Sequence, residues 1–119
     1  MNTRIEYLYR DAGNFKQFAS VVLEGEITTR DREAIAAALD SGEYFIPSQV
    51  GLGDLQAPFP DPDLDHVWHE LDVKSGITLT ADAATCNMDV HRFASMFTGQ
   101  WDVTVAMKRL GLPPPFDRR

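Results

Sequence analysis

Cysteine is nearly absent from the sequence, in which Cys86 stands alone. One cysteine cannot form a disulfide within the chain, so we expect a fold held together by its hydrophobic core. Apolar runs of about 18 or more residues are also missing, as is a charged leader followed by an apolar stretch. These absences argue against a membrane protein and favour a cytoplasmic one.

Basic residues are missing from the middle third of the chain. Residues 33–73 hold nine acidic and no basic residues, whereas residues 1–32 hold five of each. Residues 74–119 hold four acidic and six basic residues, so the formal net charge of −7 originates in the middle segment. A field of one sign attracts basic partners and repels nucleic-acid backbones. The simpler alternative is that an acidic surface keeps a small protein soluble.

The 119 residues are 44% hydrophobic, which suffices for one core, and we expect a single domain spanning residues 1–119. Alternation in residues 4–10 predicts a half-buried strand with Ile5, Tyr7 and Tyr9 on its inner face. Turn residues follow, and then a stretch rich in β-branched and aromatic side chains. Together these features predict an N-terminal β-hairpin.

A central helix is predicted over residues 30–40. Thr28 or Thr29 can act as its N-cap, and Gly42 follows its end. The helix carries an apolar stripe that can pack on a sheet, formed by Ala34, Ile35, Ala38 and Leu39.

Two further helices are predicted near the C-terminus. The first follows Asn87 or Asp89 and ends before Gly99, with an apolar stripe of Val90, Phe93, Ala94 and Phe97. The second begins near Asp102 and ends at Gly111, with an apolar stripe of Val105, Ala106 and Leu110.

The middle of the chain predicts short strands around a long connection. Residues 43–46 read as a strand ended by Pro47, and residues 48–65 as a surface loop anchored by a few apolar residues. Residues 66–74 and 77–81 then read as two strands. In the first of these, one face would carry Val67, His69, Leu71 and Val73, and the other His66, Trp68, Glu70 and Asp72.

These elements define the expected fold class. We predict an α+β domain with a small, mostly antiparallel sheet made of the N-terminal hairpin and the central strands. One central helix and a C-terminal helical hairpin would pack on this sheet.

Four sequence blocks carry a resemblance to a known family. They are Y-R-D-A-G-N-F-K, E-G-E-I-T, G-E-Y-F-I-P-S-Q-V-G-L and W-H-E-L, and they lie between Tyr7 and Leu71. In this order they resemble a family of small uncharacterised bacterial proteins. The resemblance implies an intact cytosolic domain. It transfers no catalytic residue, and it does not extend beyond Asp82.

The stretch from Pro60 to Asp72 crowds five carboxylates and two histidines around one tryptophan. A transition-metal site needs three or four converging ligands. On a strand, His66 and His69 would point to opposite faces, so the best cluster is His66 with Glu70 and Asp72. An exposed polar strand face explains the same residues, and we predict neither a metal nor another cofactor.

Two activities remain as alternatives. A small hydrolase or nuclease-like enzyme would use His69 as a general base with Glu70 or Asp72, although His69 has the phase of a buried residue. Helix-turn-helix DNA binding through residues 82–97 is the other, although this segment offers few basic contacts. The acidity of the chain therefore argues against direct binding of nucleic acid.

We favour a third interpretation, in which the protein is a non-enzymatic binding or regulatory protein. It would dock a basic surface of a protein partner through the acidic residues 54–72, for example as an inhibitor or an immunity-like protein. Trp68 would be the aromatic anchor. The carboxylates that contact the partner would be Asp61, Asp63, Asp65, Glu70 and Asp72.

Overall fold

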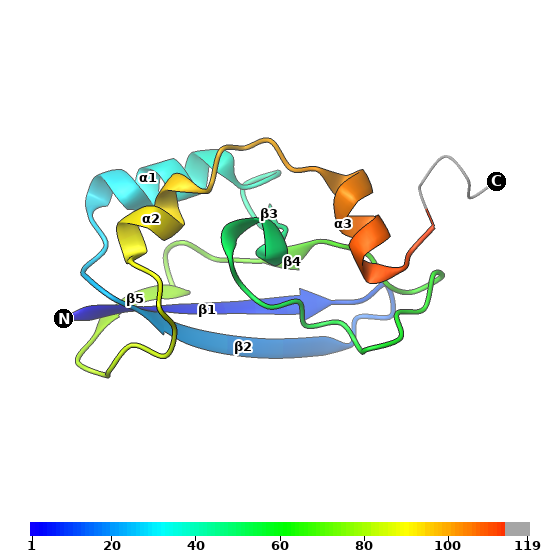
Figure 1. Ribbon diagram of the computed structural model, residues 1–119, viewed down its shortest axis with the longest axis horizontal. Helices are drawn as coiled ribbons and strands as arrows, with labels where there is room; N and C mark the ends of the chain where they lie inside the picture. Colours follow the sequence, from blue (N-terminus) through cyan, green and yellow to red (C-terminus); the bar gives the residue numbers. More distant parts are fainter. Residues whose placement is uncertain (114–119) are drawn as a thin grey trace.

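The sheet is organised around one long strand, β1 (Asn2–Arg10), in a computed structural model that describes residues 1–113. The strand pairs with β2 (Lys16–Leu23) along one side. Along the other side it pairs with β5 (Ile77–Thr80) near its start and with β4 (His69–Glu70) near its end. Strand β3 (Tyr44–Phe45) lies outside β4, and all pairs are antiparallel (Figure 1).

The expected α+β class is confirmed, and so is the N-terminal hairpin. Arg10 lies opposite Lys16, and the chain reverses through a turn in which Asn14 takes a positive φ of 65°. The predicted alternation holds, because Ile5, Tyr7 and Tyr9 are all buried.

Helix α1 (Thr29–Ala38) begins with the expected cap. The Thr28 side chain accepts a hydrogen bond from the Asp31 amide, and the Asp31 carboxylate accepts one from the Thr28 amide, which forms a capping box. Ile35 and Ala38 are buried, as predicted, whereas Ala34 is exposed. The buried stripe is therefore narrower than the sequence pattern suggests.

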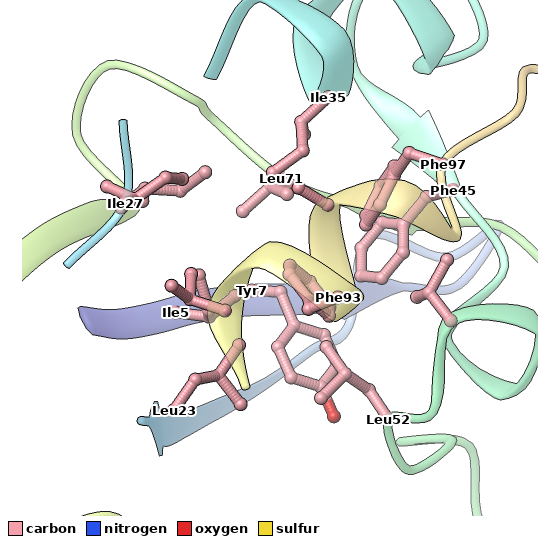
Figure 2. Close-up of a cluster of buried hydrophobic side chains, with 14 of the residues drawn as sticks. Ile5, Tyr7, Leu23, Ile27, Ile35, Phe45, Leu52, Leu71, Phe93 and Phe97 are labelled. Atoms are coloured by element: carbon pink, nitrogen blue, oxygen red, sulfur yellow. The ribbon is translucent and has the colours of Figure 1, made fainter. Parts of the chain in front are cut away.

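The main core lies between the helices and the inner face of the sheet. Figure 2 shows Ile5 and Tyr7 on β1, with Ile35 reaching down from α1 toward Leu71. Helix α2 (Val90–Ser95) adds Phe93 to this cluster. These side chains come from distant parts of the sequence, so the core fixes the position of the central strands as well as that of the helices.

The two C-terminal helices form where expected but do not form a helical hairpin. Helix α2 is capped by Asp89 and lies beside α1, whereas α3 (Val103–Leu110), capped by Asp102, lies toward the other end of the sheet (Figure 1). Helix α3 packs in a second, smaller cluster with Ile46 and Val67. The prediction of a C-terminal helical hairpin was wrong. The link between the two helices is extended, and each helix packs in a different one of the two core clusters.

The buried stripe of α3 also differs from the prediction. Ala106 and Met107 are buried, whereas Val105 is 57% exposed. Gly111 ends the helix as predicted, with a positive φ of 75°.

The central strands are shorter than predicted, but their faces are assigned correctly. Only His69 and Glu70 of the segment 66–74 belong to the sheet ladder. Val67, His69 and Leu71 are nevertheless buried, in the predicted alternation. The long connection before them contains a single 3₁₀ turn, Pro47–Val50, and its Val50 is buried in the core.

No helix among residues 1–113 combines the length and the apolar character needed to cross a membrane.

Candidate functional site

The acidic stretch from Pro60 to Asp72 comprises a tight loop, the short strand β4 and the turn that follows it. Its first part is a tight loop stabilised by its own aspartates: the Asp61 side chain accepts a hydrogen bond from the Asp63 amide (2.8 Å). The Asp65 side chain accepts one from the Asp61 amide (2.7 Å). Just before this loop, Phe59 lies between two prolines and is 93% exposed. Sequence reasoning overlooked this phenylalanine.

Asp65 is tied to the sheet. The Tyr9 hydroxyl donates to Asp65 Oδ1 over 2.5 Å and accepts from the His66 amide over 3.3 Å. Burial and the hydrogen bond to Asp65 raise the pKa of Tyr9 well above its ordinary value. Because its carboxylate is used within the fold, Asp65 supports the loop more than it can contact a partner.

His66 is also engaged within the fold. Its Nδ1 accepts a hydrogen bond from the Trp68 amide (3.0 Å), so Nε2 carries the proton and donates to the Arg10 carbonyl (2.7 Å). The ring thereby links the end of β1 to the chain that leads into β4.

His69 is fully buried, with both ring nitrogens bound to the backbone. Nε2 accepts from the Leu55 amide (3.0 Å), and Nδ1 donates to the Val67 carbonyl (3.2 Å). Burial lowers the pKa of His69 to about 4. A neutral histidine without access to solvent anchors the long loop and is not placed to meet a substrate.

The hydrolase alternative requires His69 beside Glu70 or Asp72, and these side chains do not lie together. Glu70 points to the opposite face of the sheet from His69, where it forms an ion pair with Arg10 (2.9 Å). A hydrogen bond from the Ser75 side chain lowers the pKa of Asp72, together with hydrogen bonds from the amides of Lys74 and Ser75. Neither carboxylate converges with the histidine, because a strand sends neighbouring side chains to opposite faces.

The metal cluster considered from the sequence does not assemble either. His66 is held by backbone groups, Glu70 by Arg10, and Asp72 by the turn that follows it. In the described part of the chain, no three or more histidine, cysteine, aspartate or glutamate side chains lie close enough to share a metal ion.

The helix-turn-helix alternative lacks one of its helices. Residues 82–89 form bends and an extended segment, and α2 is the only helix within residues 82–97. The expected two-helix arrangement is therefore wrong. Residues 85–90 instead run beside the end of β2, where Thr85 forms hydrogen bonds with Val22 and the Val90 amide donates to the carbonyl of Glu24, just after the strand.

Trp68 is half-buried against the second core cluster, beside Ile46 and α3. Its other side borders a shallow hollow with Asp40, Tyr44 and His66. The indole therefore supports α3 and leaves only part of its surface for a partner.

A groove of about 930 Å³ begins on the open face of the hairpin. Leu8 of β1 lies opposite Phe18 of β2 on this face, and Phe18 is 72% exposed. The groove continues past β4 to the end of α1. Its charged lining consists of one lysine, Lys74, and four carboxylates, those of Glu6, Glu43, Glu70 and Asp72.

Two of these carboxylates, Glu70 and Asp72, were predicted as contact residues, whereas Glu6 and Glu43 were missed. Glu6 alternates with the buried Ile5 and Tyr7 and so lies on the outer face of β1, but no local pattern shows that Glu43 lies near it. The available signal was the pair of apolar residues, Leu8 and Phe18, at outward positions of the predicted hairpin.

Comparison of the chain with protein-family models, curated proteins and solved structures gave no significant match. The resemblance to a bacterial family therefore stays a prediction from the four sequence blocks.

Proposed function

We propose that the protein is a non-enzymatic binding or regulatory protein that holds a basic segment of a protein partner in this groove. The observation that carries the proposal is the lining of the groove, where apolar Leu8 and Phe18 lie beside four carboxylates and a single lysine. Lysine and arginine side chains fit such a surface, because their aliphatic stems cover apolar groups while their charged ends reach carboxylates.

The charge of the groove supports a basic partner even though Glu70 is already paired. Arg10 neutralises Glu70 at the edge of the groove. Glu6 and Glu43 are exposed, and no base lies within ion-pair distance of either carboxylate in residues 1–113. These two carboxylates would attract a cationic segment and accelerate its association at low salt.

The proposal places the predicted contact residues in different roles. Glu70 and Asp72 line the groove, while Asp61 and Asp63 lie in the exposed loop that follows Phe59. This loop would form a second contact for a partner larger than the segment in the groove.

The experiment uses a labelled peptide that alternates arginine with valine, and a control peptide with glutamate in place of arginine. Fluorescence anisotropy should show binding of the basic peptide alone. Removing both charges in E6Q/E43Q should weaken binding by roughly two- to thirtyfold, since each exposed charge pair contributes about 0.2–1 kcal/mol.

The matched control is E24Q/E26Q, which removes the same charge from exposed glutamates outside the groove. Its affinity should stay close to that of the unaltered protein at about 0.15 M salt, where the screening length is about 8 Å. Equal weakening by both double variants would show a non-specific charge effect and refute binding in the groove.

A further inference from the structure

Among residues 1–113, the outer edge of β2 is covered only at one end. The Val22 amide donates to Thr85 Oγ1 (2.8 Å), and the Val22 carbonyl accepts from the Thr85 amide (2.9 Å). Main-chain groups point alternately to the two sides of a strand, so those of Lys16, Phe18 and Ser20 face the same outer side as those of Val22. No hydrogen bond from another part of residues 1–113 reaches them.

This uncovered stretch, residues 16–20, is an edge of the kind that pairs readily with another strand. Proteins commonly protect such edges with proline, a bulge or charged side chains, lysine in particular. The stretch has no proline, it pairs with β1 in an uninterrupted register, and its charged residue, Lys16, lies at its end. Phe18 at its centre is 72% exposed.

We propose that β2 of two copies of this protein pair antiparallel along residues 16–20 and form a symmetric dimer with one continuous sheet. Pairing of the whole stretch fixes the register, because Phe18 must then lie opposite Phe18 of the second copy. In that register Lys16 lies opposite Ser20 of the second copy. All outward main-chain groups of the stretch then have partners.

The side chains on the open face suit this register. Within one chain, Phe18 has Leu8 as its neighbour on β1. The dimer therefore places two phenylalanines between two leucines in one apolar row across the sheet. Such cross-strand pairs are the interactions that stabilise sheets.

The charges on both sides of this row are complementary between the copies. Lys16 lies beside Arg10, whereas Ser20 lies beside Glu6. Pairing brings the basic Lys16 of each copy toward Ser20 of the other copy, with Glu6 of that copy on the adjacent strand. Two equivalent attractions result. Within one chain Lys16 has a base as its neighbour on β1, and Glu6 has no base as its neighbour on β2. The second copy supplies the opposite charge to each.

This inference goes beyond the proposed function and is compatible with it. Pairing at the edge extends the sheet and leaves its open face uncovered, so the two grooves would lie on one face of the dimer.

Sedimentation equilibrium over a concentration series tests the dimer. The mass should rise from that of the 13.3 kDa chain toward twice this value. S20K places a lysine opposite Lys16 of the second copy at both ends of the pairing and should weaken the dimer by about two- to thirtyfold, while S20E should strengthen it by a similar factor. The same charges in T104K and T104E, at an exposed position of α3, should leave the dimer constant unchanged.

S20P is a second test, because the amide that it removes faces the open edge and not β1. It should abolish the dimer while the circular dichroism spectrum stays that of a folded chain. A wild-type chain that remains monomeric at millimolar concentration would overturn the proposal. A dimer that responds equally to S20K and S20E would place the contact elsewhere and overturn it as well.

Discussion

Acidification should destabilise the protein through His69. Burial lowers the pKa of His69 to about 4, from an ordinary value of 6.5. Between these two values the unfolded chain binds a proton that the folded chain does not, so stability falls as the pH falls through this window. The difference of about 2.5 units corresponds to about 3 kcal/mol of stability, present above pH 6.5 and lost by about pH 4.

The structural reason is the role of each ring nitrogen. A second proton would occupy Nε2, which now accepts the hydrogen bond from the Leu55 amide. The loop would lose its anchor, and two donors would face each other in a site without solvent. Opening of the loop around Leu55 should therefore accompany protonation.

Urea unfolding at intervals between pH 7.5 and pH 4 measures this effect in the unaltered protein and in H69Q. The variant starts from a lower stability, because it loses the packing of the ring, but it lacks the titration of His69. The stability difference between the two proteins should shrink by about 3 kcal/mol over the window, since all other groups contribute equally to both. A difference that stays constant with pH would refute a buried, neutral His69.

Two further predictions concern α1. Leu39 is only 5% exposed at the end of the helix, so L39A should lower the free energy of unfolding by about 2–5 kcal/mol. A loss below about 0.5 kcal/mol in chemical denaturation would indicate a surface position. His91 donates to Asp31 over 2.7 Å, and this hydrogen bond raises the pKa of His91. The protonated His91 stabilises the fold below pH 6.5, and this stabilisation is lost as the pH rises through the pKa of His91 in the folded protein. H91Q should therefore cost more stability at pH 5.5 than at pH 8. An equal cost at both pH values would contradict a charged pair.

Local signals predicted the parts of the fold that depend on neighbouring residues. The caps Thr28 and Asp89 were each one of two candidates from the sequence, and the last helix was predicted to begin near its cap Asp102, because a cap acts on amides two or three residues away. Alternation likewise assigned Val67, His69 and Leu71 to the buried face, although this segment contributes just two residues to the ladder.

What the sequence could not show depends on contacts between distant segments. Helix α3 turns Ala106 and Met107 inward because the surface available to it is made by Ile46 and Val67, far away in the chain. The groove likewise joins Glu6, Glu43 and Asp72, which no single pattern connects. For the same reason, the sequence could not show which acidic side chains form ion pairs or hydrogen bonds within the fold.

The contacts of these acids within the fold determine where unpaired negative charge remains on the surface. In the acidic middle segment, Asp54 is paired with Arg109 and Glu70 with Arg10, and Asp65 accepts the Tyr9 hydroxyl. Bases from both ends of the chain therefore neutralise part of the field that the sequence concentrates in the middle. Such pairs near the surface contribute little to stability, so their main effect is on where the remaining charge lies. Of the remaining charge, that of Glu43 and Asp72 lies beside the apolar floor of the groove, where under the proposed function a basic segment would meet both attraction and surface to bury.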